Sequence, residues 1–315
     1  MSPKFILLFL FISFSTFGQT KEIDSIVQLI ENTLDFVLKS SHESDLAKLY
    51  RSSGLPEKAE NTALLSIEHL KSYDKPEILA RAYTVLGNLN YDKWKSSIAL
   101  YYYQKVDSVL TTNKITNESL YSARLNIGSV HLRLIEDNND KKSYLKVKNY
   151  YINALEIAKQ IKDSSKIGYA YIRIGHVEKS LKNNNEALEN FKIADTYISE
   201  NSKYIKDLYY ALGVGHLHVG DEKKATFFMR KYFDLRKNSG IPQEVAIGHW
   251  SFGRHLFNIG NYKESILHEK KSAELFNSFE SIDYGRLSSV NKITYNSYEK
   301  LGDYKNAYNY FELVI

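Results

Sequence analysis

The sequence predicts an all-α solenoid in which about seven antiparallel helix pairs stack one after another. Three observations support this prediction. A small residue, usually preceded by an aliphatic or aromatic one, recurs at intervals of 38 to 47 positions, a second small residue follows each at a fixed distance, and apolar residues keep helical spacing around both. A repeat array grows by adding units rather than by enlarging one core, so 315 residues need not form two globular domains.

A small residue marks the centre of each predicted first helix. The set is Ala47, Gly87, Gly128, Gly175, Gly213 and Gly253, with Tyr295 off the pattern in a seventh unit. The small residues that follow twelve positions later are Ala59, Ala99, Ala187, Ala225, Ser265 and Ala307. In the third unit the equivalent residue is Val147, because its turn carries about seven extra residues. Two helices approach closely only where side chains are small, so these pairs predict helix crossings.

Large side chains are predicted to fill the space around each crossing. They are Tyr50, Tyr103, Tyr151, Phe191 and Tyr298. The glycines expected to end first helices in a left-handed conformation are Gly54, Gly220, Gly260 and Gly302. Glu269 stands where an aromatic residue belongs and Tyr295 where a small one belongs, so we expect their repeats to be the least regular.

These positions resemble the tetratricopeptide repeat (TPR). The clearest match is "GHVEKSLKNNNEALENFKIA", which has Gly175, Ala187, Phe191 and Ala194 in the family's places. The resemblance covers roughly residues 40–315, with a period near 40 rather than the family's 34 and an incomplete last repeat. It implies a right-handed superhelix of antiparallel helix pairs that is not an enzyme and binds a protein or peptide in a concave groove.

The first 39 residues are expected to form two further segments. Lys4, an apolar run over 5–17 and small residues up to Gly18 predict a signal peptide over residues 1–18, and an uncleaved membrane anchor is the alternative. Residues 19–39 are predicted to be a capping helix over Glu22 to Lys39. Its apolar residues at helical spacing are Ile23, Ile26, Val27, Ile30, Leu34 and Val37. The mature protein is therefore expected to be exported, periplasmic or secreted from a bacterium, with no later membrane span.

Composition and motifs argue against several classes of function. No cysteine is present, which excludes disulfides, thiolate zinc sites and a cysteine nucleophile. The net charge of +5 is spread without a basic stripe, so no nucleic acid is expected as a partner. His131, His216 and His249 fall at packing positions of their repeats, and the nine histidines show no metal-ligand spacing. Neither a nucleophile elbow nor a phosphate-binding loop is found, so neither an enzyme nor a cofactor is predicted.

The TPR resemblance implies a set of ligand-contacting residues on the first helices. Positions two, five, nine and twelve of those helices line the family's groove. Mapped onto this sequence they are Arg81, Asn88, Tyr91, Arg173, His176, Lys179, Tyr210, Trp250, Arg254, Phe257, Lys292 and Asn296. Arginine grips carboxylates and aromatic rings supply rigid contact area, so this lining favours a peptide ligand. The alternative is a merely solvated face.

Two functional hypotheses follow. Signal peptides followed by long TPR arrays resemble the extracytoplasmic sensor or input regions of bacterial signalling proteins, and in that case the chain continues past Ile315. The alternative is a free-standing periplasmic scaffold that organises envelope complexes. The apolar residues near Ile315 have three possible explanations: the chain continues, this end docks on a partner or on a second copy of the chain, or the terminal helix is short and frayed.

Overall fold

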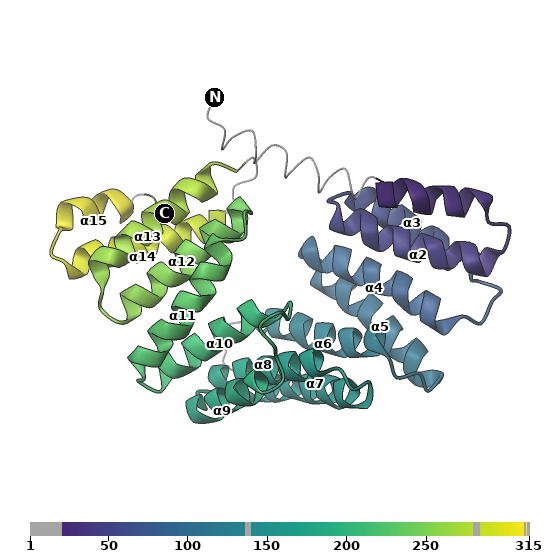
Figure 1. The fold of residues 1–315 in the computed structure, drawn as a ribbon, viewed down its shortest axis with the longest axis horizontal. Coiled ribbons are helices and arrows are strands. Elements are labelled where there is room, and N and C mark those ends of the chain that lie inside the picture. The colour runs from purple at the N-terminus through teal and green to yellow at the C-terminus, as the bar shows by residue number, and fades with distance from the viewer. Residues whose placement is uncertain (1–20, 136–139, 280–283, 312, 314–315) are drawn as a thin grey trace. The chain divides into compact units, whose positions relative to one another are not determined.

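A computed structural model describes residues 21–135, 140–279, 284–311 and 313, and these residues form helices, turns and loops without a strand. The chain divides into two compact units, residues 1–163 (unit 1) and 164–315 (unit 2). Consecutive helices run antiparallel within each unit (Figure 1). The predicted signal peptide lies outside the described residues.

Successive helices form pairs with short connections, as the sequence predicts. Unit 1 contains α2 (Phe36–Ser52), α3 (Pro56–His69), α4 (Pro76–Asp92), α5 (Ser96–Thr112), α6 (Glu118–Arg133) and α7 (Lys141–Gln160). Unit 2 contains α8 (Ser164–Ser180), α9 (Asn184–Asp195), α10 (Ile205–His218), α11 (Glu222–Lys237), α12 (Pro242–Asn258), α13 (Tyr262–Asn277), α14 (Tyr284–Lys300) and α15 (Tyr304–Phe311). Even-numbered helices are the first helices of their pairs.

The predicted helix crossings are confirmed. A Cβ atom added to Gly87 would lie 2.5 Å from the ring of Tyr103, and one added to Gly175 would lie 2.4 Å from the ring of Phe191. Both rings are almost completely buried. Each glycine therefore makes room for a large side chain on the second helix of its pair, so the two helices interlock rather than merely touch.

Helix ends in the two units reach the same backbone conformation with and without glycine. Gly220 has φ +83°, as predicted for a residue that ends a helix in the left-handed region. Lys182 has φ +65° at the corresponding place after α8, where a side chain makes this conformation less favourable. Trp94, Lys114 and Lys162 are the other non-glycine residues of this kind in the described chain.

The first helices lie on the inner side of the curve within each unit. Neighbouring first helices touch one another, as α2 does α4, α4 does α6, α8 does α10 and α12 does α14. Within the described residues, no two second helices make contacts of comparable extent. Stacked helix pairs whose first helices lie closer together than their second helices curve toward the side of the first helices. The first helices therefore form the concave side within each unit.

The N-terminal capping segment differs from the prediction. Residues 21–32 are helical, residues 33–35 are not, and α2 then begins at Phe36. The Asp35 carboxylate accepts a hydrogen bond from the Leu38 backbone N–H at 2.8 Å and so starts a new helix. Leu34, predicted to pack, is 93% exposed in the break. The single helix over Glu22 to Lys39 is therefore wrong, and the first helix pair begins before residue 40.

Among the described helices, none is both long enough and apolar enough to cross a membrane.

Candidate functional site

The inner face of unit 2 brings together predicted ligand-contacting residues from three first helices. Arg254 on α12 donates a hydrogen bond from Nη2 to the Tyr210 hydroxyl on α10, at 2.6 Å. The Arg254 guanidinium also lies over the Trp250 ring, 5.0 Å from its centroid. Both partners are uncharged, so they orient the guanidinium without neutralising it.

Lys179 on α8 faces the same place. Burial lowers the pKa of Lys179, and the positive charge of Arg254 lowers it further. Among the described residues, neither an ion pair nor a hydrogen bond from the Lys179 ammonium to an acidic group is present. The charges of Lys179 and Arg254, on helices separated by α10, thus act on each other, and among the described residues neither cation forms an ion pair with a carboxylate. We call Lys179, Tyr210, Trp250 and Arg254 the cationic site.

His176 adjoins the cationic site as an uncharged ring. Its centroid lies 5.2 Å from that of Phe191 and 6.5 Å from that of Tyr210. Burial lowers its pKa to about 3, and the nearby Arg173 and Lys179 charges contribute. His176 is therefore neutral at pH 7, and it serves as a packing surface below the two cations rather than as a third positive charge.

The acidic groups of this face lie elsewhere on it. Glu244, near the start of α12, pairs with Lys206 at 2.7 Å and with Arg236 at 2.9 Å. Ten residues of helix separate Glu244 from Arg254, which corresponds to about 15 Å along the axis. The face thus has a neutralised acidic end and an uncompensated cationic end.

Glu269 lies beneath Arg254 but does not neutralise it. Its side chain occupies the place against Gly253 that Phe191 occupies against Gly175. Both carboxyl oxygens are buried and have no hydrogen-bond partner in the described chain. Burial raises the pKa of Glu269 well above its usual value, although Arg254 opposes this effect. Burial therefore favours the uncharged form of this carboxyl group, and among the described residues Arg254 forms no ion pair with it.

The predicted residues of unit 1 are engaged within the fold. Arg81 on α4 donates to Asp45 at 3.0 Å on α2. The Asn88 side-chain oxygen accepts a hydrogen bond from the Tyr103 hydroxyl at 2.8 Å. The first of these contacts joins two first helices and the second joins the two helices of one pair, so Arg81 and Asn88 contribute to packing within unit 1.

Tyr91 belongs to a cluster that sequence reasoning missed. The Arg133 guanidinium lies 3.3 Å from the Tyr91 ring centroid and 4.4 Å from that of Trp94, and it donates to the Tyr91 carbonyl at 2.7 Å. Trp94 is 75% exposed and follows α4. Its place in a polar turn was the one available signal, because a large exposed aromatic side chain there is unusual.

The remaining predicted residues are less closely associated with the cationic site. Phe257 packs on Tyr262 at the start of α13, with ring centroids 5.5 Å apart. On α14, Lys292 is exposed and Asn296 is half-buried. Arg173 on α8 is half-buried, and its charge acts on the pKa values of both His176 and Asp207.

His216 and His249 in unit 2 are packing residues, as predicted. His216 is buried and stacks on Phe228 at 5.7 Å, and His249 contacts Phe233 at 5.1 Å. Burial lowers the pKa of His249 to about 4, helped by the neighbouring His268. In the described parts of the chain, no three metal-ligating side chains are grouped where they could hold an ion.

His255 gives a testable pH dependence. It is 3% exposed, its Nε2 shares a hydrogen bond with the Thr226 hydroxyl at 2.9 Å, and burial lowers its pKa to about 4. Since the unfolded value is about 6.5, the stabilisation is complete above that pH and is lost as the pH falls toward 4. We expect His255 alone to lower the stability of unit 2 by about 1 kcal/mol between pH 7 and about pH 5.5.

Urea unfolding at the two pH values, followed by the fluorescence of Trp250, measures this loss in unit 2. A Trp94→Phe background removes the signal of unit 1, since the chain has only these two tryptophans. His255→Gln is expected to show a smaller decrease on acidification. An identical decrease in both proteins would show that His255 is not responsible.

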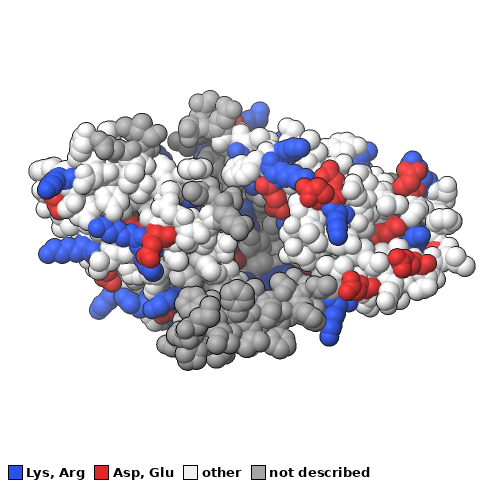
Figure 2. All heavy atoms as spheres, turned by 90° about the horizontal axis from the view of Figure 1, so that it is seen from above, with Lys and Arg blue, Asp and Glu red and all other residues white. Residues whose placement is uncertain are grey.

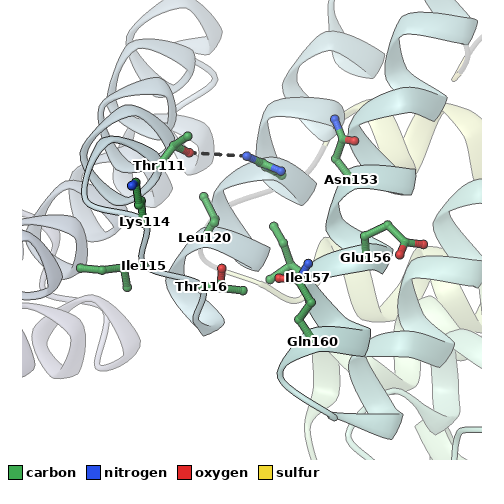
Figure 3. Close-up of a pocket in the computed structure, with 10 residues that line it drawn as sticks. Thr111, Lys114, Ile115, Thr116, Leu120, Asn153, Glu156, Ile157 and Gln160 are labelled. Carbon is green, nitrogen blue, oxygen red and sulfur yellow. Dashed lines mark hydrogen bonds between the residues drawn. The ribbon is translucent and has the colours of Figure 1, made fainter.

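Surface pockets of the two units recur at matching places. A pocket of about 320 Å³ lies between the α5–α6 turn, α6 and α7 (Figure 3), and its lining includes Arg124, Asn153 and Gln160. A pocket of about 520 Å³ lies between the α9–α10 turn, α10 and α11. Both linings mix charged, polar and apolar side chains. Because both pockets lie where one helix pair meets the next, we attribute them to the edge left there. Charges of both signs are interspersed on the face seen in Figure 2.

No protein-family model and no curated protein matches the chain. Solved structures do match. A Rap protein complexed with Competence and Sporulation Factor has a TM-score of 0.68 at 15% identity, over 94% of this chain and 78% of that one. The quorum sensor NprR from B. thuringiensis in its apo form has a TM-score of 0.62 at 12% identity, over 96% and 98%.

Two further structures extend this likeness. NprR in complex with its cognate peptide NprX has a TM-score of 0.62 at 14% identity, covering 94% of this chain and 85% of that one. A signal-transduction ATPase from Pyrococcus horikoshii with a tetratricopeptide repeat sensor has a TM-score of 0.58 at 19% identity, over 89% and 40%. At these identities the likeness concerns the fold, and the predicted TPR-type helical-repeat architecture is confirmed.

Proposed function

We propose that this TPR-like chain is a non-enzymatic interaction module whose unit 2 binds a peptide or protein segment carrying an acidic group. The single observation that carries the proposal is the uncompensated pair of cations, Lys179 and Arg254, on the inner face. The two like charges repel each other, and an anion that binds both removes that repulsion and forms charge-assisted hydrogen bonds.

Aromatic side chains around the pair suit a peptide better than a free ion. Trp250 and Tyr210 present rigid rings beside Arg254, and contacts of that kind dominate the energetics of peptide recognition. Comparison adds support of a general kind, because NprR, which has a similar fold, was solved in complex with its cognate peptide NprX, and a Rap protein was solved in complex with Competence and Sporulation Factor. A peptide in extended conformation would place its acidic group between α8 and α12 and run along the first helices.

The cellular setting belongs to the same proposal. A signal peptide over residues 1–18 would deliver the array outside the cytoplasm, where it would act as the sensor or input region of a bacterial signalling protein. The alternative is a free-standing scaffold for envelope complexes. Expression in a bacterial host tests export: a mature chain that begins at Gln19 in the envelope or medium agrees with it, and a full-length cytoplasmic chain contradicts it.

Peptide display on the immobilised mature chain tests the binding proposal. Selected peptides are titrated against the wild type and against Lys179→Met/Arg254→Met. We expect the double variant to lose at least tenfold in affinity. Replacing the acidic residue of the peptide with its amide should cause a similar loss.

The matched control is Lys223→Met/Lys263→Met, which removes two exposed lysines from the second helices α11 and α13. This control makes the same change in net charge away from the inner face, and its affinity should stay within about twofold of the wild type. Equal losses in the two double variants would mean that general charge, not the cationic site, attracts the ligand. Normal binding by Lys179→Met/Arg254→Met would place the ligand elsewhere.

A further inference from the structure

Several second helices insert a large side chain between two first helices. Phe191 on α9 shows the arrangement best: its ring lies against Gly175 on α8 and, on the other side, against Gly215 on α10. Cβ atoms added to these glycines would lie 2.4 and 2.7 Å from the ring. Gly215 lies two residues beyond the small residue at the centre of its own helix.

At the other junctions, the position two residues beyond the centre of the next first helix identifies the equivalent partner residues. On α5 the inserted side chain is Tyr103, which belongs to one apolar cluster with Val130, two residues beyond the centre of α6. On α13 the inserted side chain is Glu269, and the residue two positions beyond the centre of α14 is Ser297. A carboxyl group and a hydroxyl group thus replace the ring and the apolar or small partner.

Neither polar group at this junction is satisfied. Glu269 and Ser297 are both 0% exposed. The carboxyl oxygens of Glu269 and the hydroxyl of Ser297 have no hydrogen-bond partner among the described residues. A buried polar group without a partner destabilises the packed state relative to one in which water reaches it. Docking of α14 on α13 is therefore weakened at this point.

Other buried residues make one end of the α13–α14 junction polar and the other apolar. Thr294 on α14 and Ser265 on α13 are completely buried, and their hydroxyls bond to backbone carbonyls rather than to each other. Toward the start of α14, by contrast, Val290 packs with Phe276 and Ala246 in an apolar cluster. We call Ser265, Glu269, Thr294 and Ser297 the polar seam.

Beyond the polar seam, α15 adds little to the attachment of the last pair. It is 8 residues long, and Ala307 is its one buried residue. Tyr304 and Tyr308 are both more than half exposed. The last helix pair is thus held by the apolar cluster toward the start of α14 and, near the end of α14, by the exposed Lys270 of α13, whose ammonium lies 5.4 Å from the ring centroid of Tyr298 and 5.9 Å from that of Tyr310. An exposed contact of this kind is weak.

We propose that α14 and α15 open together away from α13, turning about the apolar cluster and separating at the polar seam, while α8–α13 stay packed. Opening admits water to Glu269 and Ser297 and exposes the α13 surface beside the cationic site. The last helix pair is then a movable element of unit 2, with its own stability below that of the unit as a whole.

Native-state hydrogen exchange of the full chain tests this inference. Slowly exchanging amides in α14 and α15 are expected to exchange at least tenfold faster than those in α10 and α12. Two substitutions copied from this chain's own repeats should close the junction: Glu269→Met, which matches Met229 against Gly213, and Ser297→Val, which matches Val130. Each is expected to slow exchange in α14 and α15 by at least tenfold.

Glu274→Met serves as the control, because it makes the same substitution on the exposed side of α13. Its exchange in α14 should remain that of the wild type. The inference is overturned if α14 and α15 exchange as slowly as α10 and α12 in the wild type. It is also overturned if neither Glu269→Met nor Ser297→Val slows exchange in α14 relative to the control.

Discussion

Gly175→Ala is expected to lower the free energy of unfolding of unit 2 by about 2 kcal/mol, although alanine is the better helix former. Its methyl group would lie 2.4 Å from the Phe191 ring. The ring has no room to move away, because Gly215 packs against its opposite side, where an added Cβ atom would lie 2.7 Å from the ring. A shift of the ring therefore cannot accommodate the added methyl group, and the two helices must move apart.

A double-mutant cycle isolates this interaction. Phe191→Ala alone should lower the unfolding free energy by about 3 to 5 kcal/mol, because it leaves a cavity between three helices. In that background, Gly175→Ala is expected to be neutral or stabilising. The first repeat already has such a pair, since Ala47 and Ala63 occupy the same two positions and both are completely buried.

Urea unfolding of the four proteins, followed by Trp250 fluorescence in the Trp94→Phe background, provides the measurement. A coupling energy near 2 kcal/mol agrees with interlocked helices. Additive effects of the two substitutions would mean that the glycine is not there to receive the ring.

Glu269→Met is expected to raise the free energy of unfolding of unit 2 by about 2 kcal/mol at pH 7. Methionine fills the same space, and Met229 already lies against Gly213 in the preceding pair. The substitution removes a carboxyl group whose two oxygens are buried without partners. No hydrogen bond is lost, so the change should be favourable throughout the neutral range.

The pH dependence of this effect has a definite sign. The pKa of Glu269 is raised in the folded chain, and the unfolded value is about 4.3. Such a group favours folding most at pH values below its unfolded pKa, and this contribution is lost as the pH rises toward the folded pKa. The advantage of Glu269→Met should therefore grow from about pH 4 to pH 7. An advantage that is absent at pH 7, or that shrinks over this range, would contradict the assignment of a buried, unpaired carboxyl group.

Features that depend on short sequence distances were predictable. Gly175 and Phe191 are sixteen residues apart in one helix pair, and their residue types alone indicate a crossing. The left-handed helix ends at Gly220 and its equivalents follow from the special backbone freedom of glycine. These local rules sufficed to place the helix pairs and the inner face.

Features that depend on competition between alternatives were not predictable. The apolar spacing continues through Leu34, yet Asp35 ends one helix and starts another, because a side-chain cap there is worth more than one further apolar contact. The Arg254–Tyr210 hydrogen bond joins residues 44 positions apart, and no local pattern announces it. Glu269 is out of pattern in the sequence, but its raised pKa follows from burial that only the packed structure reveals.

Chemical-shift mapping of an acidic peptide onto the isotopically labelled mature chain tests the central claim most directly. The account predicts that shifts concentrate on the inner faces of α8, α10 and α12, around Lys179, Tyr210 and Arg254. They should disappear in Lys179→Met/Arg254→Met at the same peptide concentration. Shifts confined to the second helices α9, α11 and α13, with the double variant responding like the wild type, would contradict it.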